Sequence, residues 1–118
     1  MIKLHEKEKA DMTIAVQVSS HPEEADLIKL DKDNKMIAFI SKNADHTRAG
    51  NLANTGLCII EPQIVDLMDK EEFNFENYIY PKALEKGMKI IGYYTEEFIE
   101  DMGTPERLKK CEDYLKAQ

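Results

Sequence analysis

The feature that most constrains this chain is a strand-to-helix corner close to its C-terminal end. The apolar run 89–95 has the composition of a buried strand, and an amphipathic helix is predicted from Pro105 onward. Between them Gly103 permits a tight turn, and Thr104 can cap the helix by accepting a backbone hydrogen bond. Such connections are common ligand sites in α/β proteins. Asp101 lies in this one, where the local pattern alone favours an acid stabilised by the helix dipole over a ligand.

The rest of the chain alternates between helical and strand periodicity, which predicts a mixed α/β fold in one domain. Residues 42–53 form a polar loop of a length that is usually functional or disordered. Pro81 is expected to kink or split the helix in which it lies. Apart from the corner, the expected elements are a helix over 2–10, a strand over 12–18, a β-hairpin of 27–30 and 36–40, a strand over 57–60, and helices over 62–68 and 74–86.

Composition excludes several classes of protein. The net charge is -7, from 23 acidic and 16 basic residues, which argues against a nucleic-acid binder or a binder of anionic membranes. No apolar run has the length of a membrane span, and the N-terminus lacks the apolar core of a signal peptide. Cys58 and Cys111 are far apart and lie among apolar positions, so we expect reduced thiols in a cytoplasmic protein.

Side-chain chemistry gives only weak local signals of a site. Lys42 ends a strand and Arg48 shortly precedes Gly50, so both are candidate phosphate ligands, although the local sequence alone favours ordinary solvated charge. Asn54 and Thr55 stand before a strand, where their polar groups suit either sugar hydroxyls or a turn. The sequence contains no P-loop and no GxGxxG motif. The histidines have no metal-ligand spacing and are expected at the surface: His5, His21 and His46.

Several segments taken together resemble one family. In their order and spacing they are similar to the C-terminal half of a sugar-phosphate nucleotidyltransferase, with the mannose- or heptose-1-phosphate guanylyltransferase type as the closest subgroup. The resemblance implies a portion of a nucleotide-sugar transferase-like, Rossmann-like fold: a mixed sheet with a β-hairpin and flanking helices, in a single partial domain over 1–118. The segments that carry it are 5–18 (HEKEKADMTIAVQV), 26–42 (DLIKLDKDNKMIAFISK), 54–62 (NTGLCIIEP), 73–87 (FNFENYIYPKALEKG) and 101–108 (DMGTPERL).

The resemblance also implies roles for individual residues. Asp101 matches one of the two aspartates that hold a catalytic Mg²⁺ ion in the family, and Lys42 matches the lysine that binds the sugar phosphate. Asn54, Thr55 and Gly56 match the strand entry that contacts the sugar. Arg48 remains a weaker candidate for phosphate. No catalytic residue is assigned.

Three positions depart from the family pattern. Ser41 and Asn43 stand where the family has a glutamate and a proline around the phosphate-binding lysine, and Asp26 replaces a small glycine over the sugar. The family's nucleotide-binding half, with its Gly-rich loop and second metal aspartate, has no counterpart in this sequence. In the family, that Gly-rich loop carries an arginine and a lysine. In-line transfer of a nucleotidyl group needs such cationic groups and Mg²⁺ to neutralise the charge that develops on the phosphates. We therefore expect no turnover by this chain alone, and a Mg²⁺ ion shared with the missing half or a partner chain.

Two functional hypotheses follow. In the first, the chain is the sugar-1-phosphate-binding part of an enzyme that makes NDP-sugar and pyrophosphate. Its nucleotide-binding half is then either a separate polypeptide, after gene splitting, or the remainder of a longer chain of which this is a truncated piece. In the second, it is a degenerate, non-catalytic module for oligomerisation or regulation. Under either hypothesis, strands that would pair with the missing half are left as open edges, so we expect a homo-oligomer.

Overall fold

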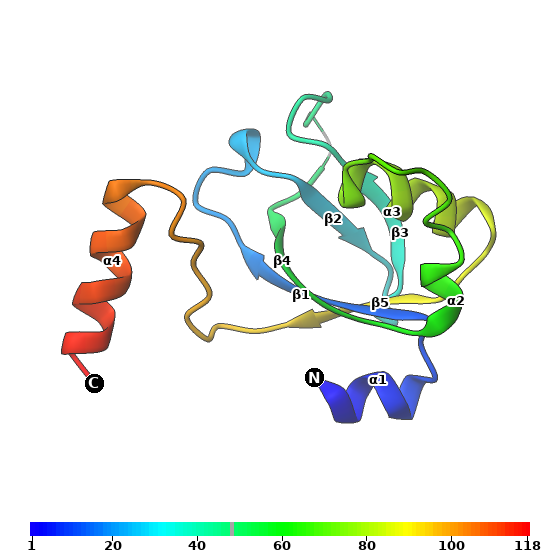
Figure 1. The fold of residues 1–118 in the computed structure, drawn as a ribbon, viewed down its shortest axis with the longest axis horizontal. Coiled ribbons are helices and arrows are strands. Elements are labelled where there is room, and N and C mark those ends of the chain that lie inside the picture. The colour runs from blue at the N-terminus through cyan, green and yellow to red at the C-terminus, as the bar shows by residue number, and fades with distance from the viewer. Residues whose placement is uncertain (48) are drawn as a thin grey trace.

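The computed structural model describes residues 1–47 and 49–118, in which five strands form one sheet. Helices lie around this sheet (Figure 1). The predicted α/β architecture with a mixed sheet and a hairpin is confirmed. The elements are α1 (Ile2–Glu8), β1 (Met12–Val18), a 3-10 turn (Pro22–Glu24), β2 (Leu27–Leu30), β3 (Met36–Ile40), β4 (Leu52–Ile60), α2 (Pro62–Val65), α3 (Phe75–Glu85), β5 (Ile90–Tyr94) and α4 (Pro105–Lys116).

The sheet has the strand order β3-β2-β4-β1-β5, so β1 lies inside it. β1 is antiparallel to β4 and parallel to β5. Its alternating pattern predicts one buried face, but Thr13 and Ala15 on the other face are also buried, while Val18 is exposed. α1 packs on that second face, where its buried side chain His5 forms a hydrogen bond with Thr13.

The main core lies between the sheet and the helices α2 and α3. Ile64 from α2 and Ile79 from α3 are fully buried in the cluster that contains the apolar side chains of β1. The N-terminus of α3 is capped as predicted, because Asn74 Oδ1 accepts a hydrogen bond of 2.9 Å from the backbone N–H of Asn77. α3 continues through Pro81, so this proline does not split the helix, which was one of the two expected outcomes.

The β2–β3 hairpin turns back over the outer edge of β5. Lys35 forms a bridge with Ile91, and the N–H of Gly92 donates to the carbonyl of Asn34 at 2.8 Å. Leu30 lies directly against Gly92, where a side chain of any size would collide with it. The hairpin therefore covers part of the outer edge of β5.

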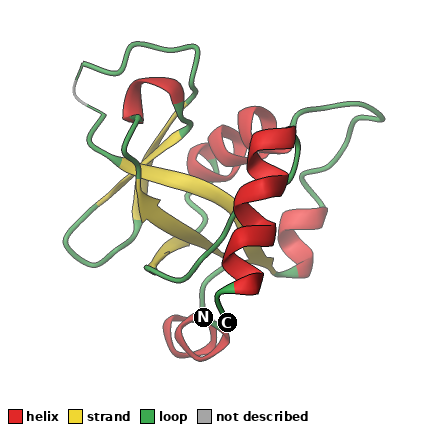
Figure 2. Ribbon diagram, turned by 90° about the vertical axis from the view of Figure 1, so that its left-hand side faces the viewer, coloured by secondary structure: helices red, strands yellow, loops and turns green. Residues whose placement is uncertain are grey.

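α4 stands apart from this core at the end of a long connection, at the left of Figure 1 and in front of the sheet in Figure 2. Its predicted apolar face is only partly used, since Cys111 is buried but Leu108 and Leu115 are 44% and 69% exposed. Phe98 of the connection stacks on Tyr114 with ring centroids 4.0 Å apart, which holds the helix to its own connecting segment.

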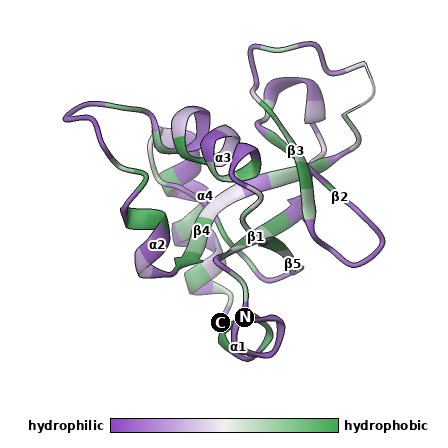
Figure 3. Ribbon diagram, turned by 90° about the vertical axis from the view of Figure 1, so that its right-hand side faces the viewer, coloured by the Kyte–Doolittle hydropathy of each residue, from purple (hydrophilic) through white to green (hydrophobic). Residues whose placement is uncertain are grey.

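Hydropathy follows this arrangement. In Figure 3 the inner parts of the strands carry the apolar residues and the hairpin tip is hydrophilic. Both cysteines are free thiols, as expected. No helix within residues 1–47 and 49–118 is long and apolar enough to cross a membrane.

Candidate functional site

The segment Asn54-Thr55-Gly56 forms an irregularity inside a strand, where the sequence predicts a turn leading into one. β4 begins at Leu52, and its register against β1 shifts at this point. Gly56 has a φ of 87°, in the left-handed region that favours glycine. Asn54 Oδ1 accepts a hydrogen bond of 3.0 Å from the Gly56 N–H, and Thr55 Oγ1 donates to the carbonyl of Ala15 at 2.8 Å. These side chains thus replace ladder hydrogen bonds that the irregularity removes.

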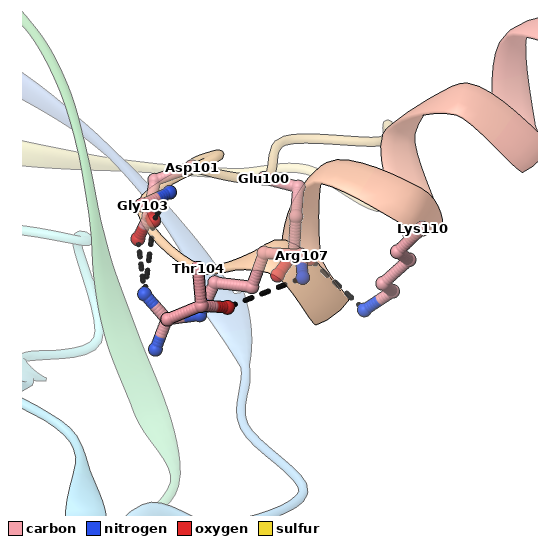
Figure 4. A network of polar contacts seen from close by, with 6 residues as sticks. All are labelled: Glu100, Asp101, Gly103, Thr104, Arg107 and Lys110. Atoms are coloured by element: carbon pink, nitrogen blue, oxygen red, sulfur yellow. Dashed lines mark hydrogen bonds and ion pairs between the residues drawn. The ribbon is translucent and has the colours of Figure 1, made fainter.

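The corner at Asp101 has the local structure that the sequence predicts. Thr104 Oγ1 accepts a hydrogen bond of 3.2 Å from the Arg107 N–H and so caps α4, and Pro105 is the first helical residue. Asp101 Oδ1 accepts from the Gly103 N–H at 2.9 Å, which closes the turn (Figure 4).

Asp101 also forms an ion pair across this turn. Arg107 Nη1 lies 2.9 Å from Oδ1 and 2.9 Å from Oδ2 of the carboxylate (Figure 4). The Gly103 N–H and the Arg107 guanidinium together hold the pKa of Asp101 below its ordinary value. A parallel pair follows one turn further along α4, where Lys110 Nζ lies 2.9 Å from Glu100 Oε2.

These two segments line a common cleft of about 400 Å³. The cleft brings together predicted site residues that are distant in the sequence, namely Asn54 and Thr55 from β4 and Asp101 from the corner. Its polar lining is completed by Gln17, Ser19, Ser20, Glu100, Arg107 and Lys110.

The other predicted ligands lie differently. Lys42 follows β3, and its backbone N–H donates to Asp26 Oδ1 at 2.7 Å, while the Asp26 carbonyl accepts from the Asn54 N–H at 3.0 Å. Lys42 is therefore adjacent to the strand that carries Asn54, but neither Lys42 nor Gly56 is among the described residues that line the cleft. Arg48 lies outside the residues that the structure describes.

Sequence reasoning missed the two bases of the cleft, Arg107 and Lys110. Their spacing of three residues places both on one face of α4, and their proximity to the Asp101 turn is a signal that could have indicated them. The same spacing is usual on a solvated helix face, so the pattern alone does not separate the two interpretations.

The expectation of a surface position for His5 is wrong. His5 is 5% exposed, and its Nδ1 lies 2.7 Å from Thr13 Oγ1 and its Nε2 2.7 Å from Glu61 Oε1. The ring connects α1 to β1 and to the residue that follows β4. Its position in a charged, amphipathic N-terminal segment concealed this role.

The residues present do not form a magnesium site by themselves. Mg²⁺ prefers near-octahedral oxygen coordination, usually with one or two carboxylates plus phosphate oxygens. In this cleft both oxygens of Asp101 already contact Arg107. Nowhere in residues 1–47 and 49–118 do three or more histidine, cysteine or acidic side chains form a group that could hold a metal ion.

The chain has relatives among characterised enzymes, although no protein-family profile matches it. It is 27% identical over 108 residues to a mannose-1-phosphate guanylyltransferase of Mycobacterium tuberculosis, covering 90% of this chain and 30% of the relative. It is 30% identical over an alignment of 127 residues to a glucose-1-phosphate adenylyltransferase of Clostridium perfringens, covering 100% of this chain and 32% of the relative. The chain therefore spans about a third of the length of these relatives.

A solved structure shares the fold. A Bacillus anthracis protein assigned as a glucose-1-phosphate thymidylyltransferase, crystallised with sucrose, superposes with a TM-score of 0.76 at 14% identity. The match covers 96% of this chain and 46% of that protein. This match shows a shared fold, and the two relatives show that the chain is homologous to about a third of the length of sugar-1-phosphate nucleotidyltransferases.

Proposed function

We propose that this chain is the sugar-1-phosphate-binding part of a nucleotidyltransferase, which makes NDP-sugar and pyrophosphate from an NTP and a sugar-1-phosphate. The observation that carries the proposal is the cleft in which Asn54 and Thr55 meet Asp101, three matches to the family pattern from segments more than forty residues apart. Both curated relatives are named for transfer to a sugar-1-phosphate.

The lining of the cleft suits a ligand with both hydroxyls and a charge. The amide of Asn54 and the hydroxyls of Ser19 and Ser20 are neutral groups that can donate and accept hydrogen bonds. Thr55 is a weaker candidate for direct contact, because its hydroxyl already donates to a carbonyl and accepts from the Leu57 N–H. Asn54 is therefore the residue of this segment that we expect to contact the sugar.

Nucleotide binding requires groups from outside these 118 residues. We propose that another polypeptide, or another segment of a longer one, supplies the phosphate-cradling loop and a second carboxylate. Asp101 would then contribute one ligand to a shared Mg²⁺ ion. The chain alone is expected to release no pyrophosphate from GTP and mannose-1-phosphate, and turnover clearly above a no-protein blank would overturn this expectation.

Calorimetric titration tests the binding proposal directly. Mannose-1-phosphate and glucose-1-phosphate are titrated separately into the chain, with mannose as the ligand control. We expect saturable binding of at least one sugar phosphate, and weaker binding in Asn54→Ala, because the Asn54 side chain lines the cleft. A matched control is Asn77→Ala, which alters an amide on the exposed side of α3 away from the cleft. No heat of binding at millimolar sugar phosphate would refute the proposal.

A second candidate function, association with another copy of the chain, is favoured by one observation. Met102, Leu108 and Leu115 are 62%, 44% and 69% exposed on and beside α4. Burial of such side chains against an equivalent helix would stabilise a homo-oligomer. Light scattering over a range of concentrations measures this, and a monomer at high concentration would contradict it.

A further inference from the structure

Two base–acid pairs form the wall of the cleft that is nearest to α4. Arg107 contacts Asp101 and Lys110 contacts Glu100, each at 2.9 Å (Figure 4). The side chains of Arg107 and Asp101 are 50% and 71% exposed. Ion pairs between exposed groups contribute little to stability, because solvent screens them and two long side chains must be ordered. The Arg107–Asp101 pair can therefore separate at a low cost in free energy when a phosphate group binds Arg107 in place of the carboxylate.

The geometry of this pair leaves most of the guanidinium group unused. A guanidinium has five N–H donors in a planar fork that matches carboxylate or phosphate oxygens two at a time. In this structure a single nitrogen, Nη1, makes both contacts to Asp101. Such a bridging contact does not use the parallel fork, so a phosphate group offers Arg107 a better arrangement than Asp101 does.

The cleft also separates charged from neutral groups. Arg107 and Lys110 are the basic side chains among its described lining, and both come from α4. Neutral hydrogen-bonding groups, those of Asn54 and Ser19 among them, come from the sheet and from the connection after β1. A ligand with one phosphate and several hydroxyls fits this division, with its phosphate toward α4 and its sugar toward β4.

We propose that Arg107 binds the phosphate of the sugar-1-phosphate and that Asp101 is its resident counter-anion, which the phosphate displaces. The inference rests on the proposed function. It adds Arg107 as a phosphate ligand and states that phosphate replaces the Asp101 carboxylate there. It also accounts for the poor fit of the cleft to a metal ion in the chain as it stands, because Arg107 supplies the positive charge at Asp101.

The proposal predicts that substitution of Asp101 strengthens phosphate binding and that substitution of Arg107 weakens it. Asp101→Asn keeps a side-chain oxygen for the Gly103 N–H but removes the charge that competes with phosphate. Phosphate affinity should therefore rise, by about two- to fivefold, which is the range expected from the strength of an exposed ion pair. Arg107→Gln removes a charged donor and should weaken binding by about tenfold or more.

The test is titration of mannose-1-phosphate by calorimetry in chelator-treated, metal-free buffer. Lys109→Gln is the matched control, since Lys109 lies on α4 outside the cleft and pairs with Asp113 at 3.8 Å. It should bind as the unmodified chain does. Amide spectra confirm that each variant keeps the fold, so a change in affinity reports on the cleft.

The outcomes are distinguishable from a failure of the proposed function. If the unmodified chain does not bind the sugar phosphate, both the proposed function and this inference are refuted. If the unmodified chain binds but Arg107→Gln binds equally well, or if Asp101→Asn binds more weakly, only the exchange of Asp101 for phosphate at Arg107 is overturned.

Discussion

Gly92→Ala tests the contact by which the hairpin closes over the edge of β5. A Cβ atom at Gly92 would lie 2.5 Å and 2.8 Å from the two terminal methyl carbons of Leu30 and 3.2 Å from its Cγ. The φ of Gly92 is not in the left-handed region, so alanine can adopt the backbone and the cost is steric. Overpacking a fitted contact costs about 1–3 kcal/mol. Because methyl groups at the end of a side chain can shift partly, we expect a loss of about 1–2 kcal/mol in the free energy of unfolding.

Urea denaturation followed by circular dichroism measures this loss, and a double-mutant cycle identifies its cause. Leu30→Ala creates space next to residue 92, so Gly92→Ala should cost much less in that background than in the unmodified chain. The coupling free energy should have about the size of the single-variant loss. If Gly92→Ala is as stable as the unmodified chain, or if the two losses simply add, then Leu30 does not pack on Gly92 as described.

Three further predictions concern local contacts. His5→Leu should lower the free energy of unfolding by about 1–3 kcal/mol, because it leaves the buried Thr13 hydroxyl without its partner, and stability equal to the unmodified chain in urea would contradict this. Thr104→Ala removes a helix cap worth about 1 kcal/mol, and it should speed amide exchange in α4 but not in the sheet. Hydrogen bonds from Lys82 and Tyr78 lower the pKa of Asp69 to about 2 from 3.8. The stabilisation from Asp69 is therefore full above pH 3.8 and lost as the pH falls toward 2, so unmodified chain and Asp69→Asn should differ in stability at pH 5 and converge near pH 2.

Periodicity and local capping chemistry predicted most of the elements. The alternation over 12–18 gives the bounds of β1, and Asn74 and Thr104 mark the starts of α3 and α4 because caps act within one helical turn. Pro81 does not split α3, although a proline inside a helix removes one backbone N–H donor.

The features that the sequence did not predict depend on contacts between segments, and local residue patterns do not specify those contacts. The burial of His5 follows from the docking of α1 on β1, and the irregularity at Asn54–Gly56 follows from the register of β4 on β1. Likewise, the pairing of Arg107 with Asp101 depends on the path of the turn, which residue types alone do not specify. The candidate site was thus predicted as a set of residues, whereas its cleft and its bases required the structure.

The most direct test of the central claim is an amide-resolved NMR titration with mannose-1-phosphate. Binding in the cleft should produce saturable shifts that cluster on its separate segments, including the amides of Ser19, Asn54 and Gly103, with mannose alone giving smaller changes. No saturable shift at millimolar ligand, or shifts confined to residues outside the cleft, would contradict the assignment of this chain as a sugar-1-phosphate-binding part of a nucleotidyltransferase.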